Sequence, residues 1–199
     1  MDTTQKRDSI RSEILQYRED LPSSQRDVFS KQIVEHIIEW LQSGENGEEI
    51  YTFDAVMVYL SMKSEVDTWQ LVQSLFDMKK RVIAPVVDTD SGKLIPRQIL
   101  NLDKDLVKHK YGMYEPDVSC PIFPSDQLQL IIVPAIAFDY QGYRLGYGKG
   151  FYDRFLSTCP NAITIGLAFQ VQLVDDTYPQ SWDIPVQHIF TENGLLLPK

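Results

Sequence analysis

The sequence predicts an α/β fold: a single three-layer α/β/α domain over residues 1–199, with a mostly parallel, mixed and Rossmann-like sheet. Two observations lead to this prediction. Short runs rich in valine and isoleucine have the composition of strands buried on both faces. These runs alternate with segments whose apolar residues recur at helical spacing, and such alternation produces parallel sheets with right-handed crossovers.

Two helices are expected before the first strand. In residues 4–19, Ile10 and Ile14 fall on one face of a helix together with a tyrosine. Pro22 ends this helix, and the two serines that follow can cap the next one. The second helix carries apolar residues at helical spacing to about residue 43.

The next part of the chain predicts strands separated by a helix. Residues 54–60 have the composition of a buried strand, and the loop SMKSEVD then leads into a helix at about 67–80. Residues 81–87 predict a second buried strand, and 93–100 predict an edge strand because its proline lacks an amide donor. Residues 101–127 are long for a structureless loop, so we expect them to cover a site.

The most informative stretch is residues 130–156, LIIVPAIAFDYQGYRLGYGKGFYDRFL. A buried strand at 130–134 leads into a long glycine-rich turn at 138–149, and a helix is expected to begin near Gly150. Glycines let the backbone approach an anion, and free amides at a helix start point toward it. Three basic and two acidic residues give the turn and helix a formal charge of +1, whereas the whole chain carries -9. This local charge indicates an anionic partner.

The last strands are predicted at 162–168, 188–191 and 195–197, with a short turn or helix near residues 171–175. In parallel sheets, ligands bind beyond the carboxyl ends of the strands. Three loops leave those ends. We expect them to converge on one cleft: SMKSE after the first strand, the glycine-rich loop after Pro134, and Phe169 with Gln170.

Neither common phosphate-loop pattern fits the glycines. A Walker loop needs G-x-x-x-x-G-K-[ST], but Phe151 follows Gly150. A dinucleotide fingerprint could begin at Gly146 and Gly148, but its third glycine is absent. The remaining pattern, R-L-G-x-G-x-G-[FY]-Y-D, leaves open both a phosphate site and a plain glycine-rich turn. The flanking arginine and lysine favour the phosphate site.

The composition argues against several classes of function. The chain has 28 acidic and 19 basic residues, which argues against a general nucleic-acid binder. No run approaches the roughly 18 apolar residues of a spanning helix, and the first residues lack the apolar core of a signal peptide. Cys120 and Cys159 are isolated, and the three histidines show no zinc spacing. We expect a cytoplasmic protein with reduced cysteines that binds neither nucleic acid nor membrane.

The run VPAIAFDYQGYRLGYGKGFYDRFL resembles the signature of the 5-formyltetrahydrofolate cyclo-ligases, also called 5,10-methenyltetrahydrofolate synthetases. That signature reads P-G-x-x-F-D, then G-x-R-L-G-x-G-x-G-[YF]-Y-D. A basic pair four residues apart near the N-terminus, L-S-M-x-x-E-[VI]-D-T after the first strand and a late proline–aspartate motif match in order. The resemblance therefore extends over most of the chain. Ala135 departs from it, since the family usually has glycine there, as does Arg7, where lysine is frequent.

The resemblance implies MgATP-dependent cyclisation of 5-formyltetrahydrofolate to 5,10-methenyltetrahydrofolate, with release of ADP and phosphate. The γ-phosphoryl group would pass to the formyl oxygen, N10 would attack the activated carbon, and phosphate would leave as the ring closes. ATP is then a co-substrate and Mg²⁺ the metal. The folate carries a polyglutamate tail or none, and we expect a monomer.

The matching motifs also imply roles for individual residues. The catalytic cations are Arg144 and Lys149. The ATP site comprises Arg7, Arg11, Arg144, Leu145, Gly146, Tyr147, Gly148, Lys149, Gly150, Phe151 and Tyr152. The folate site comprises Leu60, Glu65, Tyr147, Gly148, Lys149, Gly150 and Phe151, and Tyr111 and Tyr114 are weaker candidates. The magnesium ligands are Asp153 and Asp183.

The residues taken without the resemblance leave simpler interpretations open. Arg7 and Arg11 lie one turn apart, which by itself favours a solvated helix face. Asp153 is suited to a helix start, and Asp183 to a turn. Aromatic residues at helical spacing are more often core than site.

Two other classes of function also stay open. One is a sugar-phosphate isomerase or CoA-transferase-like enzyme on a related α/β scaffold, which needs a catalytic base at the loop and no ATP. The other is a regulator that holds a folate without turnover. ATP-dependent formation of 5,10-methenyltetrahydrofolate separates both from the cyclo-ligase.

Overall fold

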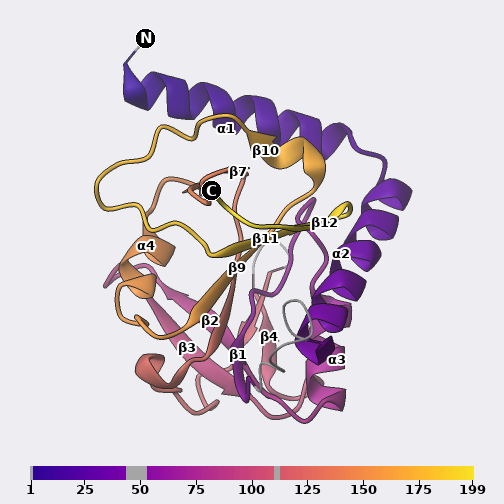
Figure 1. The fold of residues 1–199 in the computed structure, drawn as a ribbon. Coiled ribbons are helices and arrows are strands. Elements are labelled where there is room, and N and C mark those ends of the chain that lie inside the picture. Colours follow the sequence, from indigo (N-terminus) through magenta and orange to yellow (C-terminus); the bar gives the residue numbers. More distant parts are fainter. Residues whose placement is uncertain (1, 44–52, 110–112) are drawn as a thin grey trace.

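The computed structural model describes residues 2–43, 53–109 and 113–199 (Figure 1). Its centre is a seven-stranded sheet. In spatial order the strands are β12 (Gly194–Leu196), β11 (His188–Thr191), β9 (Ile163–Leu167), β6 (Leu130–Val133), β1 (Ala55–Met57), β2 (Arg81–Asp88) and β3 (Lys93–Ile99). Strands β11, β9, β6, β1 and β2 run parallel, and the two edge strands are antiparallel to their neighbours. The predicted mixed, mostly parallel sheet is confirmed, as is the predicted edge strand at 93–100.

Helices cover both faces of this sheet (Figure 1). On one face α2 (Ser23–Ser43) and α3 (Trp69–Asp77) bury an apolar cluster that includes Ile33, Leu71 and Ile132. On the other face α4 (Phe151–Leu156) packs Phe155 onto a second cluster that includes Met57. The inner strands β1, β6, β9 and β11 are buried from both sides, which explains their continuous apolar runs.

The N-terminal helix α1 (Thr3–Asp20) does not lie on the main sheet. It crosses the molecule beside a small three-stranded sheet made of β10 (Leu173–Val174), β7 (Ala137–Asp139) and β8 (Arg144–Leu145) (Figure 1). Ile14 packs there against Ile136 and Leu145. Asp2 caps the helix: its carboxylate accepts a hydrogen bond from the Gln5 amide at 2.9 Å, and the Gln5 side chain accepts one from the Asp2 amide. This helix therefore presents its arginines to the carboxyl ends of the main strands.

The long turn predicted at 138–149 is wrong, because the β7–β8 hairpin occupies most of it. Asp139 makes this hairpin. Its buried carboxylate accepts hydrogen bonds from the amides of Gln141 and Tyr143, each at 3.0 Å, and from the Thr177 hydroxyl at 2.6 Å. Gly142 completes the turn with φ +87°. The glycine-rich loop is thus only residues 146–150, and Asp139 is a structural residue.

Other elements differ from the prediction mainly in their extent. The strand predicted at 54–60 pairs only over β1. The region 101–127 contains a hairpin of β4 (Leu106–Lys108) and β5 (Tyr114–Pro116), and a 3₁₀ turn η2 (Ser125–Gln127). A second 3₁₀ turn, η3 (Gln170–Gln172), stands where the sequence predicts a short turn or helix. The 3₁₀ turn η3 is tied to a distant part of the chain, because the Gln172 side chain donates to the carbonyls of Ala135 and Ile136, and local patterns do not report such a contact.

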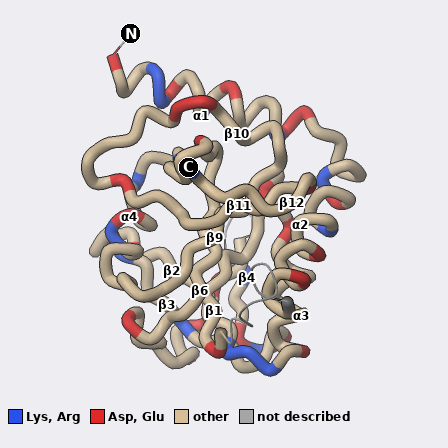
Figure 2. The backbone as a smooth tube through the Cα atoms, in the orientation of Figure 1, with Lys and Arg blue, Asp and Glu red and all other residues tan. Residues whose placement is uncertain are grey.

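The first two helices carry acidic residues among their basic ones. Figure 2 shows acidic residues along both α1 and α2. In the described part of the chain, no helix combines the length and the apolar character needed to cross a bilayer.

Candidate functional site

A cavity of about 870 Å³ opens at the carboxyl ends of β1, β2 and β6. Helix α1, the loop after β1, the glycine-rich loop and the segment 180–183 form its walls. The predicted site residues that line it are Arg7, Arg11, Leu60, Glu65, Arg144, Gly146, Tyr147, Gly148, Lys149, Gly150, Phe151, Tyr152, Asp153 and Asp183. Leu145 does not line it, because this side chain is fully buried against Ile14.

The convergence of three loops predicted from the sequence is only partly correct. The loop after β1 and the glycine-rich loop meet at the cavity, but Phe169 and Gln170 do not reach it. The Phe169 ring is fully buried and packs beside Phe29, with 6.3 Å between ring centroids. A later segment takes the expected place and brings Gln180 and Asp183 to the cavity. The apolar side chain after β9 therefore belongs to the core.

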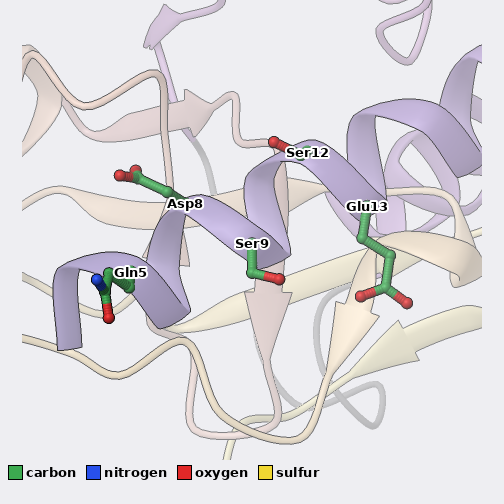
Figure 3. A pocket seen from close by; sticks show the side chains of 5 residues that line it. All are labelled: Gln5, Asp8, Ser9, Ser12 and Glu13. Atoms are coloured by element: carbon green, nitrogen blue, oxygen red, sulfur yellow. The ribbon is translucent and has the colours of Figure 1, made fainter. Parts of the chain in front are cut away.

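A second depression lies on the outer side of α1 and is lined by residues of that helix alone. Figure 3 shows its side chains: Gln5, Asp8, Ser9, Ser12 and Glu13. A site needs convergent groups from several elements, and this surface offers one helix face. We assign no function to it.

Two arginines of α1 contact the far walls of the main cavity. Arg7 donates a hydrogen bond to Asp183 Oδ2 at 2.7 Å and another to the Tyr178 carbonyl at 3.0 Å. Arg11 donates from Nε to the Gly146 carbonyl at 2.9 Å and forms an ion pair with Asp8. These contacts exclude the interpretation that Arg7 and Arg11 lie on a solvated helix face. The two arginines connect α1 to Asp183 and to the glycine-rich loop.

Arg144 and Asp153 form a buried ion pair on the opposite wall. Arg144 Nη2 donates to Asp153 Oδ1 at 2.8 Å, and Nη1 donates to the Ile184 carbonyl. The Arg144 side chain is only 4% exposed, and this burial lowers its pKa, although the charge of Asp153 opposes the shift. The amide of Ile184, the residue after Asp183, also donates a hydrogen bond to Asp153 Oδ1 at 3.3 Å. This hydrogen bond links the segment that carries Asp183 to Asp153.

Lys149 differs from these arginines. Its side chain is exposed at the cavity, and in the described part of the chain its ammonium group forms no ion pair. Only its backbone carbonyl is engaged, by Arg154 at 3.0 Å. Three predicted cations are therefore fixed by protein acceptors, and the fourth is able to follow a ligand.

The three glycines of the loop have different backbone requirements. Gly148 and Gly150 adopt φ of +84° and +63°, whereas Gly146 does not have a positive φ and a methyl group there would meet nothing within 4 Å. We expect Gly148→Ala to lower the free energy of unfolding by about 1–2 kcal/mol, because alanine is strained in that conformation. Gly146→Ala should leave it unchanged. Thermal unfolding of both variants checks this, and equal destabilisation would contradict it.

Glu65 is partly buried at the end of the loop after β1. Its Oε2 accepts a hydrogen bond from the Met62 amide at 3.0 Å, and its other oxygen accepts none from the described residues. Burial raises the pKa of Glu65, while the Met62 amide and the charges of Arg18 and Lys63 oppose the shift. The carboxylate thus keeps one oxygen available to a ligand in the cavity.

The aromatic residues of the glycine-rich loop and α4 divide into two kinds. Tyr147 is 52% exposed. Phe151 lines the cavity and also packs against the core, so it is a cavity residue and a core residue at once. The Tyr152 hydroxyl is buried and has no hydrogen-bond partner among the described residues. Burial, and next the charge of Glu65, raise the pKa of this phenol. A neutral donor without a partner in a cavity indicates a ligand acceptor.

Comparison with known proteins identifies the family. The family model described as "5-formyltetrahydrofolate cyclo-ligase family" matches residues 3–192. The chain belongs to this family. A 5-formyltetrahydrofolate cyclo-ligase of Haemophilus influenzae is 30% identical over 186 residues, covering 92% of this chain and 96% of the relative. One of Escherichia coli is 34% identical over 139 residues, covering 68% and 76%. This cyclo-ligase family member is an enzyme of the ligase class.

Solved structures confirm the cyclo-ligase fold. The 5,10-methenyltetrahydrofolate synthetase of Aquifex aeolicus superposes with a TM-score of 0.79 at 27% identity, covering 97% of this chain and 93% of the other. That of Mycoplasma pneumoniae gives 0.75 at 22% identity, covering 96% and 99%, and supports the fold alone.

The structure explains how alanine is tolerated at position 135, where the cyclo-ligase signature has glycine. Ala135 lines the cavity, and its backbone is not in the left-handed region that would require glycine. The alanine methyl is therefore accommodated without backbone strain, and it narrows the cavity by one methyl group.

Some cavity residues were missed by the sequence analysis of this cyclo-ligase. Met113 and Glu115 line the cavity beside the candidate Tyr114, so part of the region 101–127 borders it. Tyr111 lies outside the described residues. Trp182 is 67% exposed at the rim. Its position directly before Asp183 was the one signal that could have indicated it.

Proposed function

We propose that the protein converts 5-formyltetrahydrofolate to 5,10-methenyltetrahydrofolate with consumption of MgATP and release of ADP and phosphate. One observation carries this proposal. An unpaired ammonium group, two aspartates and a carboxylate with a free oxygen face one cavity, at Lys149, Asp153, Asp183 and Glu65. This is the set of charges that a nucleotide triphosphate, a divalent cation and a pterin ring need together.

The phosphates of ATP would lie between α1 and the glycine-rich loop. Arg7 and Arg11 approach from the helix, Lys149 from the loop, and Arg144 from strand β8 just before it. The three arginines are held in place by protein acceptors, so their guanidinium donors are already positioned and need no reorganisation when charge moves. Phosphoryl transfer depends mainly on such positioning and charge neutralisation.

The donor set fits Mg²⁺. In both aspartates one oxygen carries the protein contacts: Asp153 Oδ1 accepts from Arg144 and Ile184, and Asp183 Oδ2 accepts from Arg7 and the Gln180 amide. The second oxygen of each accepts no hydrogen bond from the described residues. Magnesium prefers one or two carboxylates completed by phosphate oxygens and waters, so these oxygens would hold it. The bound cation would neutralise charge on the phosphates.

The folate would lie with its pterin at Glu65. A carboxylate accepts two hydrogen bonds from a ring that carries an amino group beside a ring N–H. Glu65 lines the cavity, and one of its oxygens accepts no hydrogen bond from the described residues. Leu60 adds an apolar contact, and the Tyr152 hydroxyl supplies the neutral donor that lacks a protein partner. The formyl group would then point toward Lys149.

The chemistry follows from this placement. The formyl oxygen attacks the γ-phosphorus, the bond to the bridging oxygen breaks, and ADP leaves. N10 then attacks the activated carbon and the five-membered ring closes. The bond between that carbon and the phosphate oxygen breaks, and the leaving phosphate carries away the proton that N10 loses. Lys149 would neutralise charge on the transferred phosphoryl group, and no covalent bond to the protein is needed.

The alternative functions have less support. An isomerase or transferase of the kind considered above needs a free base at the loop, but Asp153 is held by Arg144 and Ile184. A folate-binding regulator has no need of an unpaired cation beside two aspartates. The family match over residues 3–192 favours the cyclo-ligase over both.

Turnover is the direct test. Purified protein with MgATP and 5-formyltetrahydrofolate should show growth of 5,10-methenyltetrahydrofolate absorbance, with one ADP formed for each product molecule. Omitting ATP should abolish it. Product formation without ATP, or ATP hydrolysis without product, would reject the proposed reaction.

Asp153→Asn should weaken the dependence of the rate on Mg²⁺. The amide offers one neutral oxygen in place of a charged one, so we expect half-maximal activity at about tenfold higher Mg²⁺. The buried Arg144 also loses its counter-ion, and thermal unfolding separates that cost from the metal effect. Exposed Asp126→Asn is the matched control. An unchanged magnesium titration would remove Asp153 from the metal site.

The proposal places the enzyme in the cytoplasm as a monomer, with a polyglutamate tail tolerated on the folate. Cys120 and Cys159 are both buried and unpaired, in keeping with a reducing compartment. Gel filtration should give a mass near 23.0 kDa.

A further inference from the structure

Arg18 is a buried arginine that the proposed reaction has not used. It lies on α1, is 2% exposed and does not line the cavity. Its Nε donates to the Ser64 hydroxyl at 3.1 Å, and its Nη2 donates to the Tyr147 hydroxyl at 3.2 Å. Within the described ranges, no carboxylate lies close enough to form an ion pair with it. A buried charge that has only neutral partners is costly to keep, so a purpose beyond packing is expected.

The two partners of Arg18 belong to two different walls of the cavity. Ser64 directly precedes Glu65, which the proposed function assigns to the pterin. Tyr147 stands in the glycine-rich loop between Gly146 and Gly148, which the proposed function assigns to phosphate. One guanidinium group therefore fixes the folate wall against the nucleotide wall, with its planar fork reaching both.

Arg18 also acts electrostatically on the Glu65 carboxyl, which its hydrogen-bond partner Ser64 directly precedes. The other titratable groups that act on this carboxyl are Lys63 on its own loop, Tyr59 after β1 and Tyr152 on α4. The two phenols are neutral, and Lys63 is exposed, so water screens its charge. Arg18 is thus the buried positive charge that favours an ionised Glu65.

We propose that Arg18 is a positioning residue for folate recognition: by donating hydrogen bonds to Ser64 and Tyr147 at once, it holds Glu65 in place against the glycine-rich loop. This inference rests on the proposed function, because 5-formyltetrahydrofolate is the ligand through which it is tested. Arg18 touches no reacting atom in this proposal; it acts through Glu65.

Arg26, which contacts the C-terminal end of α1, provides a matched control. Arg26 of α2 donates to the carbonyls of Arg18, Glu19 and Leu21, which closes the C-terminal end of α1. It contacts neither Ser64 nor Tyr147. Arg26→Met therefore removes a guanidinium that serves the fold, whereas Arg18→Met removes one that is proposed to serve the ligand.

The experiment is a double-mutant cycle on the intact enzyme, measured by steady-state kinetics. We expect Arg18→Met to raise the KM for 5-formyltetrahydrofolate about tenfold, the size of coupling seen between neighbouring groups, while the KM for ATP stays within about twofold. In a Glu65→Gln background the same substitution should change the folate KM less than about twofold. The acid limit of folate binding should move to higher pH in Arg18→Met. Arg26→Met should lower Tm and leave the folate KM unchanged.

Several results would overturn the inference. An equal effect of Arg18→Met with and without Glu65 would show that the arginine does not act through that carboxylate, and an equal KM change in Arg26→Met would show a general loss of fold. If Arg18→Met does not fold, Arg18→Lys is the second variant. Lysine keeps the positive charge but lacks the planar guanidinium group, so the KM for 5-formyltetrahydrofolate should rise while the acid limit of folate binding stays at the wild-type pH. An unchanged folate KM in Arg18→Lys would reject the proposal. Absence of wild-type turnover would instead reject the proposed function.

Discussion

Lys149→Ala is expected to lower kcat by about 100- to 1,000-fold, the loss typical of removing one group that stabilises transition-state charge. The reason is the contrast among the four cavity cations. Arg7, Arg11 and Arg144 are fixed by protein acceptors, and only Lys149 is exposed with its ammonium group unpaired in the described chain. A cation that moves with the phosphoryl group contributes more in the transition state than in the ground state. The KM values should therefore change much less than kcat.

The structure provides clean controls for Lys149→Ala. Because the side chain is exposed, far-UV circular dichroism and Tm should match the wild type. Lys31→Ala, an exposed lysine on α2 that pairs only with Glu35 at 3.8 Å, should leave kcat unchanged. Lys149→Arg should recover part of the rate, since it restores charge but places a planar fork where a compact ammonium was. A kcat within twofold of wild type in Lys149→Ala would remove the residue from catalysis.

The sequence was sufficient for the large elements of the fold because their patterns are local. The buried strands and the helices α1 and α2 each carry their own apolar pattern, and the edge strand β3 carries a proline. The β7–β8 hairpin could not be predicted in this way, since it depends on Asp139, whose second oxygen is satisfied by Thr177 far along the chain. An acidic residue in a glycine-rich stretch looks like a surface charge until its distant partner is known.

In the candidate site, too, local motifs were predictable from the sequence and tertiary contacts were not. Matching motifs located Arg144, Lys149 and Glu65, and the cavity brings them together. What the sequence could not provide is which charges are already engaged. Arg144 is neutralised by Asp153 and Lys149 is not, although both flank the same glycines. The burial of Arg18 depends on tertiary contacts that the helical pattern of residues 4–19 does not report.

Glu65→Gln is expected to weaken 5-formyltetrahydrofolate binding by about 10- to 100-fold, the value of one or two hydrogen bonds to a charged group. The glutamine still offers an acceptor to the Met62 amide, so the loop should keep its shape. Isothermal titration with the folate measures the loss, and Glu35→Gln, on an exposed carboxylate of α2, is the control. An effect confined to the KM for ATP would contradict the assignment of Glu65 to the pterin.

The same substitution should make the protein more stable at neutral pH. Burial raises the pKa of Glu65 in the folded state, so the charged form is disfavoured there. An acid with a raised folded pKa costs stability as the pH rises from its unfolded pKa through its folded pKa, and the cost is complete above the latter. Glu65→Gln removes that cost, so its Tm should exceed the wild-type Tm at neutral pH. The two should converge at a pH below the unfolded pKa of glutamate.

Wild-type folate binding should weaken as the pH falls through the raised pKa of Glu65, and Glu65→Gln should lack this acid limb. Gain of stability together with loss of binding is the signature of a carboxylate kept for its ligand at the expense of the fold. A Glu65→Gln protein that loses both stability and binding would show instead that the residue serves the loop. The pair of measurements therefore separates a ligand-binding carboxylate from a structural one.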